Sequence, residues 1–205
     1  MTFDQIKKRL STTTVGIAGC GGLGSNCAVA LARVGIGKLI IVDFDRVTVS
    51  NLNRQYFFLD QVGQTKTIAL KENIRRIDPT IAVEALEVKL TPETIPTIFA
   101  FCDIVVEAFD LADQKEMLIE TILTHFPEKP LVVGLGMAGW GKSDLIHLRK
   151  SDNLYICGDE VSEISEELPP LAPRVGMVAN MQANVVLEIL LGSEKRNADY
   201  FKQSD

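Results

Sequence analysis

Residues 17–25 read Ile-Ala-Gly-Cys-Gly-Gly-Leu-Gly-Ser, and this stretch decides the fold. An apolar run at residues 13–18 leads into it and is typical of a short buried strand. An alanine-rich segment at residues 23–34 follows and predicts a helix. The pattern therefore predicts a strand, a tight glycine turn and a helix whose N-terminus favours an anion.

The glycines complete the G-x-G-x-x-G pattern of nucleotide-binding loops. We expect the first to allow the tight turn, the second to admit a ligand close to the backbone, and the third to let the helix pack against the strand. We assign nucleotide binding to five residues of this loop: Gly19, Gly21, Gly22, Leu23 and Gly24. The alternative is a strand-to-helix turn that binds nothing.

A cluster of polar side chains follows the next expected strand, at residues 38–43. Asp43 ends that strand, 19 residues after the last glycine of the pattern, where a carboxylate reaches a ribose hydroxyl. Its alternative role is to cap the loop at the strand end. Asp45, Asn53 and Arg54 come within the next dozen residues. A hydride-transfer enzyme has no evident need for these groups, whereas an enzyme that handles phosphates does.

Composition narrows the class of protein. The chain has 205 residues, 46% hydrophobic and 23% charged, which suits one globular domain, and its net charge of −6 argues against nucleic-acid binding. It has no apolar leader and no membrane-length apolar run, so we expect a cytoplasmic protein without a membrane partner. Its four cysteines form no C-x-x-C pair, so we expect free thiols and no structural zinc.

Strand and helix signals alternate along most of the chain, which predicts a doubly wound, Rossmann-like α/β domain over residues 1–205. The sheet is expected to be mainly parallel, with helices on both faces and a short antiparallel extension. The remaining expected strands are 82–88, 103–108, 131–136, 144–149 and 153–157. The remaining helical segments are 60–77, 92–101, 112–126 and 173–191. Outside them lie a polar N-terminal segment (1–10), an acidic loop expected to be mobile (158–172) and a polar tail (193–205).

On these motifs the chain resembles the ubiquitin-activating-like adenylyltransferases of the ThiF, MoeB and HesA type. It looks most like the short members that activate the sulfur carrier protein of thiamine biosynthesis. The similarity covers roughly residues 10 to 192. The matching pieces are residues 19–25, Asp43-x-Asp45, residues 50–55, Gly63-x-x-Lys66 and Glu107-Ala-Phe-Asp110.

The resemblance implies an activity and a set of partners. ATP and Mg²⁺ would bind at the glycine loop, and the C-terminal Gly-Gly carboxylate of a small ubiquitin-fold sulfur carrier would attack the α-phosphate, releasing pyrophosphate. The substrate supplies the nucleophile, so the enzyme must mainly position two anions and neutralise charge. The resemblance also implies a homodimer, and the apolar faces of the helices after Gly24 and Pro173 are candidates for its contact. A sulfur donor protein is a further expected partner.

Three residues are expected to carry the catalytic work. Arg54 suits phosphate oxygens, with a surface salt bridge as the alternative. Lys66 lies at a helix start, which is unfavourable for a cation, so a phosphate is expected to hold it; the alternative is a solvated lysine. The resemblance gives Asp110 the role of magnesium ligand, and the alternative is a helix N-cap.

The chain departs from the family pattern at several points. Phe109-Asp110-Leu111 stands where relatives usually have Thr-Asp-Asn, which removes an amide from the metal site. The two C-x-x-C pairs of longer relatives are absent. Relatives often begin with an arginine-bearing helix that reaches the partner subunit's site. Here only Lys7, Lys8 and Arg9 could substitute, and a solvated helix end is the simpler interpretation.

Cys157 is a candidate for a covalent link to the carrier, because it alone among the cysteines borders the acidic loop. The alternative is an inert thiol at a strand end, since neighbouring carboxylates should raise its pKa.

Three rival functions stay open. The glycine loop and Asp43 also suit an NAD-binding oxidoreductase. The altered motif at Asp110 also fits a non-catalytic nucleotide-binding scaffold. A relative that acts on a modified transfer RNA base is disfavoured by the acidic charge.

Overall fold

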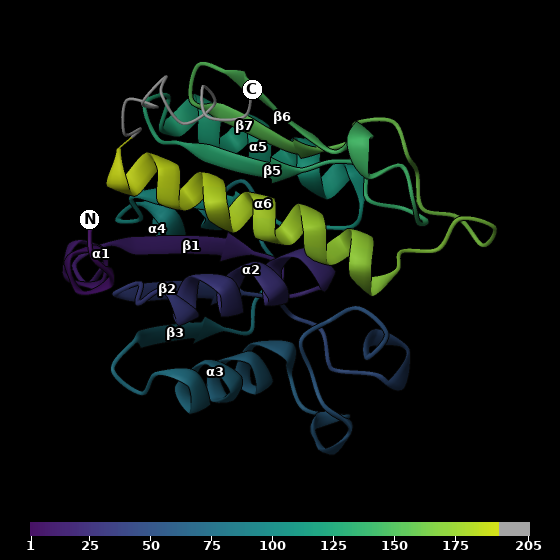
Figure 1. Cartoon of the computed structure of the whole chain (residues 1–205), viewed down its shortest axis with the longest axis horizontal. Helices are drawn as coiled ribbons and strands as arrows, with labels where there is room; N and C mark the ends of the chain where they lie inside the picture. Colours follow the sequence, from purple (N-terminus) through teal and green to yellow (C-terminus); the bar gives the residue numbers. More distant parts are fainter. Residues whose placement is uncertain (193–205) are drawn as a thin grey trace, which may run out of the picture.

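The computed structural model describes residues 1–192, and its centre is a seven-stranded sheet in the order β3-β2-β1-β4-β5-β7-β6 (Figure 1). Every neighbouring pair is parallel except β6 and β7, which form the antiparallel extension. This confirms the predicted fold class. The strands are β1 Thr14–Ala18, β2 Lys38–Val42, β3 Ala82–Leu86, β4 Ile104–Glu107, β5 Leu131–Gly134, β6 His147–Ser151 and β7 Leu154–Gly158.

Helices cover both faces of the sheet (Figure 1). Helices α2, α3 and α6 bury the larger apolar cluster on one face, while α4 and α5 bury a second cluster on the other. Among residues 1–192, none of the helices combines the length and apolarity needed to span a membrane. The helices are α1 Phe3–Leu10, α2 Gly22–Arg33, α3 Lys66–Ile77, α4 Thr94–Phe99, α5 Ala112–His125 and α6 Ala172–Leu191.

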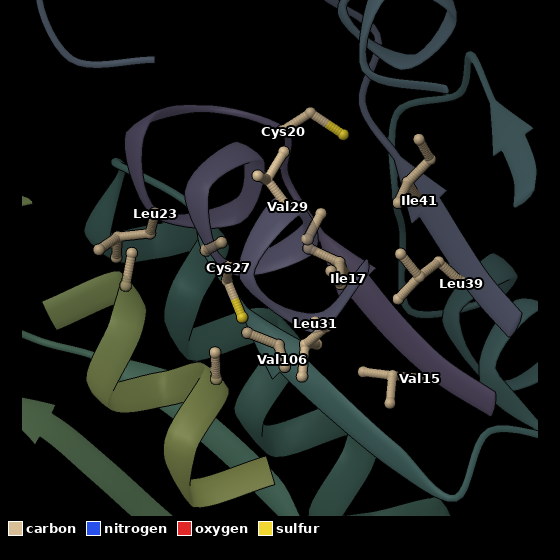
Figure 2. Close-up of a cluster of buried hydrophobic side chains, with 14 of the residues drawn as sticks. Val15, Ile17, Cys20, Leu23, Cys27, Val29, Leu31, Leu39, Ile41 and Val106 are labelled. Carbon is tan, nitrogen blue, oxygen red and sulfur yellow. The ribbon is translucent and has the colours of Figure 1, made fainter. Parts of the chain in front are cut away.

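Helix α2 is the centre of the larger cluster. Figure 2 shows Val29 and Leu31 of α2 beside Ile17 of β1 and Val106 of β4. Helix α6 packs along the other side of α2. The apolar faces of α2 and α6, the two predicted candidates for a dimer contact, are therefore buried largely within the chain itself.

Several boundaries differ from the sequence prediction. The antiparallel strand begins at His147 instead of residue 144, because Ser143–Leu145 forms a 3₁₀ turn after Lys142, which has a left-handed backbone. The basic cluster of the N-terminal segment is the last turn of α1, a helix that Thr2 starts with a capping box. Residues 159–171 contain no helix or strand, and the predicted tail at 193–205 lies outside the described residues.

Candidate active site

A cavity of about 620 Å³ opens at the carboxyl ends of β1, β2 and β4. The chain order of the strands reverses between β1 and β4, and open α/β sheets bind ligands at this switch point. The volume is in the range of small-molecule sites. Nine of the predicted site residues line the cavity: Gly19, Gly21, Gly22, Leu23, Asp43, Asp45, Arg54, Lys66 and Asp110.

Gly24 supports the glycine loop from behind and does not line the cavity. A Cβ on Gly24 would lie 1.8 Å from the carbonyl oxygen of Gly19, so only glycine lets α2 start this close to the strand end. Gly19 itself has φ of 97°, the left-handed conformation that its tight turn needs. Helix α2 begins without any side-chain cap, which leaves its N-terminus available to an anion.

Asp43 ties the end of β2 to the glycine loop. Its Oδ2 accepts a 2.7 Å hydrogen bond from the Cys20 amide, and its Oδ1 accepts a 2.8 Å bond from the Asp45 amide. The loop-capping role considered as an alternative is thus real. A carboxylate has room for further donors beyond these two amides, and Asp43 lines the cavity, so both roles are compatible.

Lys66 is only 6% exposed, so it is not a solvated lysine. Its Nζ donates a 2.7 Å hydrogen bond to Oδ2 of Asp45, and its backbone amide bonds the Asp45 carbonyl at 2.9 Å. The pair joins the start of α3 to the loop after β2. Asp45 neutralises the cation in the structure, and both residues line the cavity.

Arg54 makes no ion pair within residues 1–192, which rules out the surface salt bridge considered above. Its Nη1 donates to Oδ1 of Asn53 at 2.9 Å and to the carbonyl of Ser50 at 3.3 Å. Asn53 is exposed and positions this arginine without lining the cavity. Most guanidinium donors of Arg54 remain available to an anion.

Gln55 lies within the matching segment 50–55, but no motif predicts an individual role for it. Its side chain lines the cavity next to Gly21 and is 8% exposed, yet its Oε1 has no hydrogen-bond partner among residues 1–192. A buried acceptor without a partner is costly, which makes this position unusual among the residues that line the cavity.

Asp110 is exposed at the mouth of the cavity, and its carboxylate has no hydrogen bond or ion pair within the described chain. The N-cap of α5 is Leu111, so the N-cap role for Asp110 is wrong. A free carboxylate beside the predicted phosphate site suits Mg²⁺, which takes one or two carboxylates and completes its shell with phosphates and water. Asp110 therefore fits the predicted metal role.

A buried ion pair lies beneath the Asp110 turn. Glu107 is fully buried at the end of β4, and both of its carboxylate oxygens accept hydrogen bonds from Nζ of Lys115, at 3.0 and 2.9 Å. Burial raises the pKa of Glu107, and Lys115 opposes that shift. Glu107 also accepts a 2.6 Å bond from the Phe109 amide, so the pair fixes the turn that presents Asp110.

Other cavity-lining residues escaped the sequence analysis because they lack a motif. At one end, Phe44 and residues 88–90 follow β2 and β3, with the Lys89 ammonium 5.9 Å from the Phe44 ring centroid. At the other end the wall comes from loops after β5 and β7 and from the start of α6: Met137, Ile164, Pro170 and Val175.

Cys157 is fully buried on β7, and burial raises its pKa to about 12. The cause is burial rather than neighbouring carboxylates. A thiol in this state is a poor nucleophile, so the structure favours the inert alternative over the covalent role. Within residues 1–192, no three His, Cys, Asp or Glu side chains gather in a group that could hold a metal ion. The absence of zinc stays a prediction for elemental analysis.

Comparisons with known proteins agree with this geometry. The model of the ThiF family matches residues 2–205. A tRNA threonylcarbamoyladenosine dehydratase of Bacillus subtilis is 38% identical over 157 residues, which are 76% of this chain and 60% of that protein. A molybdopterin-synthase adenylyltransferase of Salmonella typhimurium is 28% identical over 90% of this chain and 75% of its own length. A sulfur carrier protein adenylyltransferase of Thermus thermophilus is 33% identical over 62% of this chain and 47% of its own length.

The fold matches a solved structure. The E. coli tRNA threonylcarbamoyladenosine dehydratase in complex with AMP superposes with a TM-score of 0.83 at 21% identity, over 91% of this chain and 89% of that one. The chain thus spans 60% of the length of one curated relative and about half that of others.

Proposed function

Because the chain belongs to the ThiF family, we propose that it uses MgATP to adenylate the C-terminal Gly-Gly carboxylate of a small ubiquitin-fold sulfur carrier protein. One observation carries the proposal: four charged side chains from separate segments, Asp43, Arg54, Lys66 and Asp110, line one cavity at the switch point of the sheet. Relatives named as adenylyltransferases of molybdopterin synthase and of a sulfur carrier support the reaction type.

In this proposal the nucleotide spans the cavity. The ribose hydroxyls donate to Asp43, and the adenine lies against the apolar surfaces of Phe44, Val88 and Leu90. The phosphates lie at the glycine loop and the N-terminus of α2, where Arg54 and Lys66 neutralise them. Gln55 lines the cavity beside Gly21 of the same loop.

The chemistry then needs little beyond position and charge. A carboxylate oxygen of the carrier attacks the α-phosphorus, the bond from phosphorus to the bridging oxygen breaks, and its electron pair leaves with pyrophosphate. No general base is needed because the carboxylate is already ionised at neutral pH. Asp110 would hold Mg²⁺, which would supply positive charge to the phosphates. Arg54 and Lys66 stabilise the charge that develops on the leaving group.

The experiment that tests this proposal is ATP–pyrophosphate exchange with purified carriers that end in Gly-Gly. We expect exchange that depends on carrier and on Mg²⁺, and none with the same carrier lacking its last two glycines. The sequence resemblance points to the carrier of thiamine biosynthesis, so that carrier leads the panel. A sulfur donor protein would act on the acyl-adenylate in a later step. The absence of pyrophosphate exchange with every carrier would reject the proposal.

The Bacillus subtilis relative favours a second candidate, a dehydratase that acts on threonylcarbamoyladenosine in tRNA. The net charge of −6 opposes it, because tRNA binding depends on neutralising phosphates. Incubation with ATP and tRNA that carries this base separates the two functions. Loss of water from the modified base, without carrier-dependent exchange, would establish the dehydratase.

Two further rivals are separated by simple measurements. An NAD-binding oxidoreductase would be stabilised against heat by NAD and not by ATP. A non-catalytic scaffold would bind ATP without any exchange of pyrophosphate.

A further inference from the structure

Two loops at one end of the cavity lie outside the nucleotide motif. We name residues 137–142 the Trp140 loop. From here on, the acidic loop means residues 159–171, the part of the predicted segment that lies between β7 and α6. Met137 comes from the first, and Ile164 and Pro170 from the second, and all three line the cavity. The loops follow β5 and β7, neighbouring strands of the sheet, and lie at the right of the sheet in Figure 1.

Arg174, in the first turn of α6, joins these loops. It is 4% exposed, and its Nη2 donates a 2.5 Å hydrogen bond to Oδ2 of Asp159, which is 5% exposed. Its Nη1 donates to the carbonyl oxygens of Gly141 and Lys142. Its Nε has no partner among residues 1–192, so the hold on the loops rests on the two terminal nitrogens.

Asp159 connects Arg174 to the acidic loop through hydrogen bonds. Its Oδ1 accepts hydrogen bonds from the amides of Val161 at 3.0 Å and Ser162 at 2.8 Å. The Ser162 hydroxyl in turn accepts a 3.1 Å bond from the Ala138 amide of the Trp140 loop. A continuous network, buried at Arg174 and Asp159 and partly buried at Ser162, thus runs from α6 through one loop into the other.

The position of this network relative to the nucleotide indicates which substrate it contacts through the loops. Asp43 and Phe44 follow β2, whereas Met137 follows β5 on the other side of the switch point. With the ribose at Asp43 and the phosphates at the glycine loop, the two loops border the opposite end of the cavity. A carboxylate that attacks the α-phosphorus in line with the leaving pyrophosphate has to arrive from a side that the nucleotide leaves free.

We propose that Arg174 is a positioning residue for the second substrate. Through its buried pair with Asp159, it fixes the Trp140 loop and the acidic loop so that the carboxylate tail of the carrier is guided to the α-phosphate. This inference rests on the proposed adenylation. Arg174 touches no substrate in it and acts only through the two loops.

The test compares Arg174→Lys and Asp159→Asn with the wild-type enzyme. A lysine has one ammonium and cannot reproduce the fork that serves Asp159 and the two carbonyls together. Asp159→Asn keeps the shape of the side chain and removes its charge, which gives a second variant if the first folds poorly. The matched control is Arg149→Lys, because Arg149 pairs with Glu160 of the same loop at an exposed site.

Two readouts are needed. In steady-state pyrophosphate release, we expect both variants to raise the KM for the carrier about tenfold or more, while kcat and the KM for ATP change less than about threefold. In hydrogen exchange, we expect faster exchange of the amides of residues 159–171, with those of β1 unchanged. The Arg149→Lys control should show neither effect.

Each outcome is decisive. An equal rise of both KM values would show that Arg174 supports the whole pocket and would overturn a role for the tail. Unchanged hydrogen exchange in Arg174→Lys would overturn the anchor even in an active enzyme. Absence of exchange of pyrophosphate in the wild-type enzyme would reject the proposed function instead, and with it the substrate that the loops guide.

Discussion

Lys66 Nζ lies 2.7 Å from Asp45 Oδ2, so the first residue of α3 is bound to the loop after β2 by a largely buried ammonium. A cation at a helix N-terminus opposes the helix dipole, and a partner must offset that cost. The Asp45 carboxylate does so in the structure. In the proposed complex, a phosphate would compete with Asp45 for the same ammonium.

Replacement of Lys66 or Arg54 by alanine should therefore impair catalysis more than folding. We expect each variant to lose about 2–4 kcal/mol of transition-state stabilisation, a fall in exchange of roughly 30- to 1,000-fold. Lys71→Ala, on an exposed site of the same helix, is the matched control and should retain full activity. Equal exchange in all three variants would exclude a catalytic role for the two cations.

Asp110→Asn should leave stability unchanged, because the carboxylate has no partner in the described chain. The variant should need a higher Mg²⁺ concentration for half-maximal exchange and should lose at least about tenfold in rate. Glu116→Gln, an exposed change on α5, controls for the loss of negative charge. A Mg²⁺ titration that coincides with that of the wild type would remove Asp110 from the metal site.

The sequence predicts the part of this site whose residues stand close to one another along the chain. The glycine loop, Asp43 and Arg54 stand at fixed spacings after apolar strands, so the edge of a parallel sheet could be predicted to bring them together. The pairing of Arg174 with Asp159 could not be predicted, because a long connection with no repeating pattern separates the two residues. The burial of these two charged side chains likewise has no signal in the local sequence.

Burial decides the behaviour of the cysteines. All four are buried, and burial raises the pKa of Cys102 and Cys157 to about 12. We expect the native enzyme to resist alkylation at pH 8 and to take up reagent only after unfolding. Cys157→Ala should keep pyrophosphate exchange. Neither this variant nor the wild-type enzyme should form an enzyme–carrier adduct. Rapid labelling of Cys157 in the native state, or a reductant-sensitive adduct in the wild type alone, would restore its covalent role.

The contact between α1 and the end of α3 should make stability depend on pH in acid. Hydrogen bonds from Lys7, at 2.8 Å, and Thr80 lower the pKa of Asp78 to about 2. This pKa is below the value near 3.9 that Asp78 has in the unfolded chain. The stabilisation of the folded state by the ionised Asp78 carboxylate is therefore fully present above about pH 3.9 and is lost as the pH falls towards 2. After discounting for solvent, we expect Asp78→Asn to cost about 1 kcal/mol at pH 7. The gap between denaturant melts of the two proteins should narrow below pH 4 and close only as the pH approaches 2, and a constant gap would refute this.

The homodimer implied by the family resemblance has fewer candidate surfaces than the sequence suggested. Helix α2 is enclosed by the chain itself. Exposed apolar side chains gather instead on the loop before α3 and on α3: Phe58, Leu59, Val62 and Ile68. We expect light scattering to give twice the 22.5 kDa of one chain, since twofold dimers are the commonest oligomers. Leu59→Lys and Ile68→Lys should shift that mass to one chain if this surface forms the contact, because a buried unpaired charge is strongly unfavourable. Leu123→Lys on α5 is the control. A wild-type mass of 22.5 kDa together with full exchange activity would show that one chain is sufficient for adenylation.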